Sequence, residues 1–243
     1  MPRANIGPLV LTGGAEFTPG NEPQDRAFLA AAAGRPVYVV ATAAVRQDPD
    51  RAVATARRWF RSLGADVEEL QLRGRRDGSD PAITAAAGDA GGVYLCGGDP
   101  GLVVELLSGT PAWGAVVGAW RNGAALGGSS AGAMALGEWS LIRAGMSHDR
   151  RRFAPALGLL PTVAVVPHLD EFGERWLPSL RLPHPDVTLL GLDTRTAAVW
   201  RPGVGWRAMG PGRVVVIRGS ERAVTTDGER PTGIGRPRPP SRS

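Results

Sequence analysis

Short apolar runs alternate with amphipathic or alanine-rich stretches along the first half of the chain. The runs that predict strands are 8–12, 36–43, 67–72, 92–96 and 124–127. The stretches that predict helices are 24–33, 50–63, 80–88, 102–107, 112–121 and 131–137. Continuous apolar strands separated by helices are typical of a parallel sheet that is covered by helices on both faces. The pattern therefore predicts a three-layer α/β/α domain with a mostly parallel central sheet.

The pattern changes near residue 162. Strands are predicted at 162–167, 188–193, 197–200 and 213–218. Short Gly/Pro turns join the last of them, which predicts antiparallel strands at one edge of the sheet. From Gly228 the chain is rich in Arg, Pro, Gly and Ser, a composition typical of disorder. We therefore expect a single α/β domain over residues 1–227 and a disordered Arg/Pro-rich tail over 228–243.

Composition narrows the choice of partners and compartment. The 243 residues include 43% hydrophobic residues, enough for one large core. All 28 basic residues are arginine, and they are scattered among acidic residues, so the net charge of +5 does not predict a nucleic-acid partner. The one cysteine, Cys96, excludes an intrachain disulfide. With no signal-like segment and no apolar run of about 18–20 residues, we expect a cytoplasmic protein that does not enter a membrane.

A candidate nucleophile lies in Gly128-Ser129-Ser130-Ala131-Gly132. This segment fits G-x-S-x-G with Ser130 at its centre, between a short predicted strand and a predicted helix. That context defines a nucleophile elbow, in which a strained turn exposes the serine and free N–H groups can stabilise an oxyanion. We expect the N–H of Ala131 to be one such donor. The alternative is a Gly/Ser-rich turn that caps an ordinary helix.

A serine nucleophile needs a base, and the chain has three histidines. His148 lies in a polar loop, and His184 lies between two prolines. His168 directly follows the predicted strand 162–167. Catalytic groups of open α/β sheets gather at the carboxyl ends of strands, where Ser130 also lies. We therefore predict that His168 is the general base.

A double glycine follows the strand that ends at Cys96. Glycines at a strand end let the backbone approach a bound group, so the Gly98 N–H is a candidate second oxyanion donor. Asp99 would either contact substrate or cap the next helix. We expect Cys96 itself to be a buried strand residue, because nothing around it forms an elbow.

Taken together, these motifs resemble the serine peptidases that include α-aspartyl dipeptidase (dipeptidase E) and cyanophycinase. The matching segments span roughly residues 10–220. They are Gly13-Gly14-Ala15-Glu16, Gly97-Gly98-Asp99, Ser130-Ala131-Gly132-Ala133, Gly158-Leu159-Leu160-Pro161 leading into His168, Gly191-Leu192-Asp193 and Thr196-Ala197. The resemblance implies a flavodoxin-like fold similar to class I glutamine amidotransferases. It also implies Ser130 as nucleophile, His168 as base, and an oxyanion hole of the Gly98 and Ala131 amides.

The resemblance leaves the acid that orients His168 open. Cyanophycinases carry Gly-Ile-Asp-Glu, and the place of that glutamate is taken here by Thr194. The candidate carboxylates are Asp193, which adjoins it on a strand; Asp170, at the His-x-Glu spacing of glutamine amidotransferases; and Glu138 and Asp149, which lie between serine and histidine as in the dipeptidase branch.

The segments expected to contact substrate also depart from cyanophycinases. Pro100 replaces a glutamine after Gly-Gly-Asp, and Leu169 opens the segment that replaces Phe-x-x-Arg after the histidine. Arg175 lies nearby as a candidate partner for a substrate carboxylate. We expect a hydrolase that cleaves an amide bond in a small peptide without a metal or cofactor, on a scaffold that allows a homodimer. The alternative is a non-catalytic binding or regulatory protein on the same fold.

Overall fold

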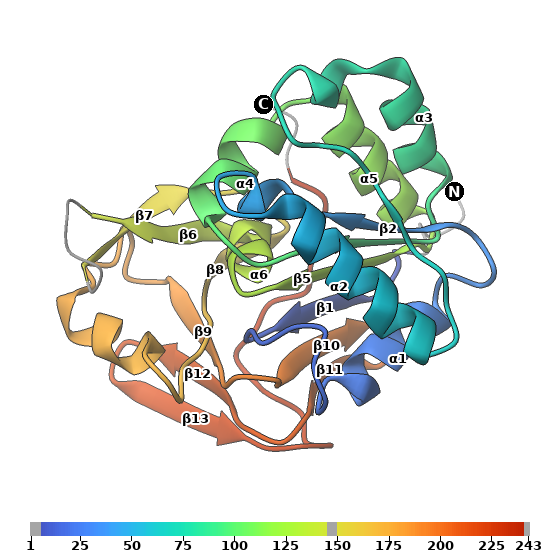
Figure 1. Ribbon diagram of the computed structural model, residues 1–243. Coiled ribbons are helices and arrows are strands. Elements are labelled where there is room, and N and C mark those ends of the chain that lie inside the picture. The colour runs from blue at the N-terminus through green and yellow to red at the C-terminus, as the bar shows by residue number, and fades with distance from the viewer. Residues whose placement is uncertain (1–5, 145–149, 241–243) are drawn as a thin grey trace.

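The computed structural model describes residues 6–144 and 150–240, and its strands form two sheets (Figure 1). The first sheet has seven strands in the order β11-β10-β1-β5-β4-β2-β3. Its parallel strands are β1 (Leu9–Thr12), β2 (Val37–Val40), β3 (Glu68–Glu69), β4 (Gly92–Leu95) and β5 (Ala125–Ser129). The antiparallel strands β10 (Ala197–Arg201) and β11 (Gly205–Met209) complete one edge.

Helices cover both faces of this sheet. Neighbouring residues of a strand point to opposite faces, and Val10 packs in one core cluster while Leu9 and Leu11 pack in the other. Phe28 of α1 (Glu22–Ala30) and Phe60 of α2 (Pro49–Ser62) share the Val10 cluster. On the opposite side lie α3 (Pro81–Asp89), α4 (Pro100–Leu107), α5 (Pro111–Arg121) and α6 (Ala131–Leu136). The predicted α/β fold with antiparallel strands at an edge is confirmed.

The second sheet has six strands in the order β13-β12-β9-β8-β6-β7. They are β6 (Gly137–Arg143), β7 (Arg151–Pro155), β8 (Leu160–Val166), β9 (Thr188–Leu192), β12 (Val214–Arg218) and β13 (Glu221–Thr225). The sequence pattern did not separate this sheet from the first one. The two sheets are joined by α6, which has only six residues. A crossover connection to another parallel strand of the first sheet needs about a dozen residues or more. The chain therefore continues directly from α6 into β6, the first strand of the second sheet.

No single helix in the described parts of the chain is both long and apolar enough to cross a bilayer. The α4–α5 pair meets those length and composition criteria only as two helices bent by 98°. Short 3₁₀ segments complete the helical structure: η1 (Thr42–Ala44), η2 (Asp77–Ser79) and η3 (Gly173–Ser179).

Residues 228–240 lie against the body of the protein rather than apart from it. The Glu229 carbonyl accepts from the N–H of Ala208 at 2.9 Å, and the Arg238 N–H donates to the Leu159 carbonyl at 2.9 Å. The indole N–H of Trp206 donates to the carbonyl of Gly235 at 3.0 Å. This differs from the disordered tail that composition predicts. Backbone hydrogen bonds and buried prolines hold the segment against the rest of the protein, and composition does not reveal such contacts.

Candidate active site

Ser130 lies at a sharp turn between β5 and α6, with φ of 49° and ψ of −111°. A non-glycine residue with positive φ is strained, and such strain is common at functional sites. The turn is also crowded: a Cβ at Gly132 would lie 2.3 Å from the Leu95 carbonyl oxygen, and one at Gly128 would lie 2.7 Å from the Gly132 carbonyl carbon. The glycines of the motif therefore allow this turn, which has the strand–turn–helix geometry of a nucleophile elbow.

His168 follows β8 and reaches the same place from the second sheet. Its backbone N–H donates to the Gly13 carbonyl at 2.7 Å, and the Ser130 N–H donates to the Thr12 carbonyl at 3.0 Å. His168 also has a positive φ, 48°. Ser130 and His168 line one pocket. Within the described residues the Ser130 hydroxyl makes no hydrogen bond, so the two side chains share a cavity without being joined.

Four neighbours fix the imidazole of His168. Nδ1 lies 3.3 Å from the Thr194 hydroxyl and 3.2 Å from Oε2 of Glu171. The ring stacks on Phe172, with centroids 4.7 Å apart and planes 23° from parallel. A Cβ at Gly14 would lie 2.1 Å from Nε2. Nε2 therefore occupies space beside Gly14 that the side chain of any other residue at position 14 would fill.

Of the candidate carboxylates among the described residues, only Asp170 lies in the His168 network. Asp170 Oδ1 accepts from the N–H of Thr194 at 2.8 Å and from its hydroxyl at 3.0 Å. The Asp193 carboxylate instead faces Arg213, whose N–H and Nε donate to Oδ2 at 2.9 and 2.8 Å. The structure thus connects Asp170 to His168 through Thr194, and it does not bring Asp193 to His168.

The other candidate acids lie elsewhere, and one carboxylate was missed. Glu138 accepts from the backbone N–H of Thr162 at 2.5 Å. Asp149 lies outside the described residues. Glu171, at Nδ1, was not selected from the sequence, although its spacing of three residues from His168 across a turn is a usable signal.

The double glycine after β4 lies at the pocket. The Gly97 N–H donates to Glu16 Oε1 at 2.7 Å, and the Asp99 N–H donates to the Ala43 carbonyl at 2.8 Å. The N–H of Gly98, between them, has no acceptor among the described residues, and Gly98 lines the pocket with Ser130. Gly98 has a φ of +140°, and a Cβ there would lie 2.2 Å from the Ala43 oxygen. Only glycine suits this close approach.

Glu16 ties this turn to the elbow. Its Oε1 holds Gly97, and its Oε2 accepts from the Ser129 hydroxyl at 2.8 Å. The two segments that carry the predicted oxyanion amides, Gly98 and Ala131, are thus joined by one carboxylate. Sequence reasoning assigned Glu16 no role beyond membership of a motif. Its position shortly after the first strand, behind Gly13-Gly14-Ala15, was the available signal.

The pocket has a volume of about 590 Å³. Its lining also includes Arg51 of α2 and two residues that precede that helix, Gln47 and Asp48. The predicted substrate contacts lie elsewhere: Asp99 caps α4 by accepting from the Gly101 N–H at 2.8 Å, and Arg175 is exposed on η3. Neither is among the residues that line the pocket. Arg51 is a lining cation that the sequence did not indicate.

Two buried ionisable groups, Asp25 and Cys96, interact electrostatically with Glu16, which lines the pocket. Burial raises the pKa of Asp25 to about 7, and the negative charge of Glu16 adds to this increase. A hydrogen bond from the Trp59 indole, at 2.7 Å, acts in the opposite direction and lowers the pKa. Burial also raises the pKa of the Cys96 thiol well above its ordinary value. Cys96 is therefore held as a thiol in the core, as expected for a buried residue rather than a nucleophile.

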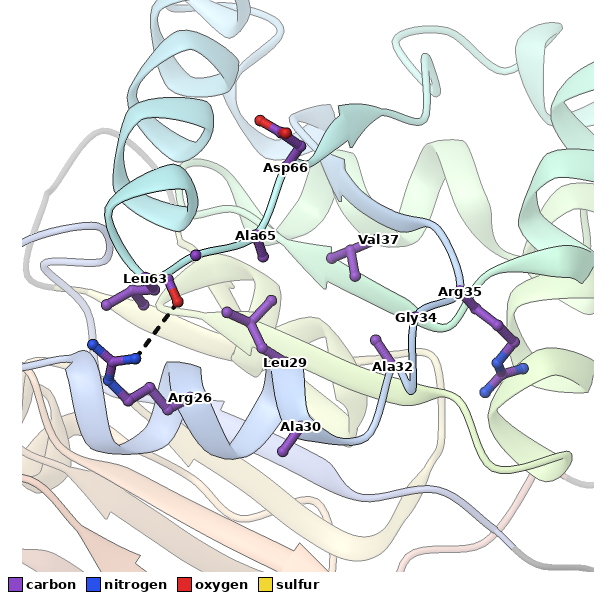
Figure 2. Close-up of a pocket in the computed structure, with 11 residues that line it drawn as sticks. Arg26, Leu29, Ala30, Ala32, Gly34, Arg35, Val37, Leu63, Ala65 and Asp66 are labelled. Carbon is purple, nitrogen blue, oxygen red and sulfur yellow. Dashed lines mark hydrogen bonds between the residues drawn. The ribbon is translucent and has the colours of Figure 1, made fainter.

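A second pocket, of about 490 Å³, lies between the carboxyl-terminal ends of α1 and α2 (Figure 2). Arg26 reaches the Leu63 carbonyl across it at 3.5 Å. Val37, the first residue of β2, lines it, so it lies at the opposite end of the sheet from Ser130. Among residues 6–144 and 150–240, no three His, Cys, Asp or Glu side chains are grouped to hold a metal ion.

Comparisons with known proteins agree with this geometry. The model of peptidase family S51 matches residues 9–201. A cyanophycinase of Trichormus variabilis is 29% identical over 234 residues, which cover 93% of this chain and 78% of the relative. A cyanophycinase of Synechococcus elongatus is 28% identical over 218 residues, 87% of this chain and 68% of the relative.

Solved structures extend the similarity to three dimensions. The crystal structure of a peptidase from an acI-B1 actinobacterium superimposes with a TM-score of 0.81 at 27% identity, covering 93% of this chain and 97% of that one. A putative peptidase E protein of Listeria monocytogenes gives a TM-score of 0.58 at 18% identity, with 90% and 98% covered. The second comparison supports the fold alone.

Proposed function

This chain belongs to peptidase family S51 and is a serine-type peptidase, and we propose that it hydrolyses an amide bond in a short peptide with Ser130 as nucleophile and His168 as general base. The observation that carries this assignment is the pairing of a strained, partly buried serine with a glycine-cradled histidine in one pocket. The resemblance of the motifs and the family membership support the same roles.

In the proposed reaction, His168 Nε2 takes the proton of the Ser130 hydroxyl as Oγ bonds to the substrate carbonyl carbon. The carbonyl oxygen becomes an oxyanion, and the N–H groups of Gly98 and Ala131 donate to it. The imidazolium then gives its proton to the leaving amine, and the carbon–nitrogen bond breaks. Water hydrolyses the resulting acyl-enzyme by the same route. Proton transfer requires the two side chains to approach to about 2.6–3.2 Å, which catalytic pairs often reach only with substrate bound.

The pocket supports a small substrate. Its volume of about 590 Å³ falls in the range of sites for small ligands. Both negatively charged side chains, Glu16 and Asp48, and a positively charged one, Arg51, line the pocket. Because Arg51 is the one arginine among these lining residues and carboxylates repel one another, Arg51 is the side chain suited to bind a terminal carboxylate of a short peptide.

The test is amine release from a panel of dipeptides, tripeptides and cyanophycin by the wild-type chain and by Ser130→Ala. We expect hydrolysis of one or more short peptides by the wild type, and a loss of at least about 1,000-fold in kcat for Ser130→Ala. Hydrolysis that survives in Ser130→Ala would contradict the assignment. Ser129→Ala is the matched control: it removes the neighbouring hydroxyl and must keep substantially more activity than Ser130→Ala.

A further inference from the structure

Thr194 lies between the predicted base and a carboxylate. Its hydroxyl is 3.3 Å from His168 Nδ1 on one side and 3.0 Å from Asp170 Oδ1 on the other. Its backbone N–H donates to the same Asp170 oxygen at 2.8 Å. Thr194 therefore holds Asp170 at two points and contacts the imidazole with its hydroxyl.

Counting protons gives the direction of the two hydrogen bonds that the Thr194 hydroxyl makes with His168 and Asp170. A hydroxyl has one proton to donate and lone pairs that accept, whereas an ionised carboxylate only accepts. The Thr194 proton therefore goes to Asp170, and the hydroxyl oxygen is left to accept Nδ1–H of His168. Of the two tautomers of a neutral imidazole, this arrangement selects the one with its proton on Nδ1. Nε2 then keeps the lone pair that a general base needs.

The rest of the ring environment agrees with this orientation. Nε2 is the nitrogen that lies over Gly14, next to the pocket. Phe172 stacks on the ring and limits its tilt. A ring flip would exchange Nδ1 with Cδ2 and Nε2 with Cε1. It would place a carbon beside the Thr194 hydroxyl, so the hydrogen bond to Thr194 opposes the flip.

Glu171 also reaches Nδ1, at 3.2 Å, but in a different environment. Its side chain is 53% exposed, so its charge is screened by water and salt, and the side chain loses conformational freedom in holding one contact. Thr194 is only 7% exposed and is fixed by its own backbone bond. A hydrogen bond at a buried, preorganised position orients the ring more effectively than an exposed ion pair.

We propose that Thr194 is a positioning residue that couples Asp170 to His168, setting the tautomer and orientation of the base through a neutral hydroxyl. This inference rests on the proposed function, because it assumes that His168 deprotonates Ser130. It assigns Asp170 an indirect role and Glu171 a lesser one.

The first experiment compares peptide hydrolysis by Thr194→Val and Thr194→Ser. Valine keeps the shape and the backbone N–H but lacks the hydroxyl, so kcat should fall by about 10- to 100-fold while KM stays within about threefold. Serine keeps the hydroxyl and should stay within about fivefold of the wild type in kcat. Wild-type kcat in Thr194→Val, or an equal loss in Thr194→Ser, would overturn the proposal.

A double-mutant cycle separates coupling from structure. If Asp170 acts through Thr194, Asp170→Asn lowers kcat in the wild type but causes little further loss in Thr194→Val. Glu171→Gln is the matched control, because its smaller loss should add to that of Thr194→Val. Additive losses for positions 170 and 194 would overturn the proposal.

If Thr194→Val does not fold, the comparison of Asp170→Asn with Glu171→Gln decides. A larger loss of kcat for Glu171→Gln than for Asp170→Asn overturns the proposal. Activity that persists in Ser130→Ala is a separate result, since it would refute the proposed function itself.

Discussion

Ser130 and His168 are anchored through their backbone amides to consecutive carbonyl oxygens, those of Thr12 and Gly13. Because consecutive Cα atoms are about 3.8 Å apart, the end of β1 sets the spacing between two residues that are far apart in the chain. The same segment continues into Gly14, which lies against the imidazole, and Glu16, which accepts hydrogen bonds from Gly97 and Ser129. The residues that follow β1 therefore assemble the site, although none of them carries out the chemistry.

Replacing Gly14 should disable the base. In Gly14→Ala the new Cβ would overlap His168 Nε2 at 2.1 Å, on a backbone with a φ of +122°. We expect kcat to fall by at least about 100-fold. Gly34→Ala is the matched control: Gly34 also has a positive φ, +79°, but nothing lies within 4 Å of its added Cβ. Backbone strain alone should lower the free energy of unfolding of each variant by about 1–2 kcal/mol. A comparable kcat in the two variants would show that the space Gly14 leaves for the His168 ring is dispensable.

Glu16→Gln should weaken oxyanion stabilisation. A glutamine offers one acceptor oxygen where Glu16 uses two, so either the Gly97 N–H or the Ser129 hydroxyl loses its partner. Misplacing the neighbouring Gly98 amide should lower kcat by about 10- to 100-fold, less than full removal of an oxyanion donor. Steady-state kinetics on a cleaved peptide measures this, and a change confined to KM would indicate that Glu16 binds substrate instead.

Asp193→Asn should affect stability rather than chemistry. The Asp193 carboxylate is buried and accepts three hydrogen bonds from Arg213. Losing its charge should lower the free energy of unfolding by about 1–3 kcal/mol, as measured by urea denaturation. Activity below the transition should remain within about threefold of the wild type. Loss of activity in a folded Asp193→Asn protein would restore Asp193 as a candidate for the catalytic acid.

Asp25 should make stability fall as the pH rises toward neutrality. Its pKa is raised by burial from 3.8 to about 7, so the folded state binds the proton more tightly than the unfolded state does. Its contribution to the free energy of unfolding is therefore complete below pH 3.8 and is lost as the pH rises to about 7. Asp25→Asn keeps an acceptor for Trp59 and should flatten this dependence in urea titrations between pH 4 and pH 8. An unchanged slope would show that Asp25 titrates normally.

Much of the fold could be predicted from the sequence because its signals are local. The strand–turn–helix around Ser130 and the strand before His168 follow from apolar runs that end in small or polar residues, and the structure confirms both positions. The second sheet could not be predicted in this way. Which strands pair depends on contacts between distant segments, and the short α6 redirects the chain without a distinct sequence signal.

The site was predictable only in part, for a similar reason. The residues proposed to perform chemistry stand out, because Ser130 is the centre of a G-x-S-x-G motif and His168 is one of three histidines. Residues that orient them do not: Thr194 resembles any polar residue in a turn, and its role becomes visible only when Asp170 and His168 lie on either side of it. Asp193 was the reverse case, since its position beside Thr194 in the sequence suggested a role that its contact with Arg213 does not support.

Covalent labelling with a fluorophosphonate tests the central claim most directly, because the reagent reacts with an activated serine hydroxyl and needs no knowledge of the substrate. The folded protein should gain one label, located by peptide mapping at Ser130, and Ser129→Ala should still be labelled. His168→Ala should reduce the labelling rate by at least about 100-fold. Labelling at another residue, or the same rate at Ser130 without the imidazole, would contradict the account of a Ser130–His168 pair.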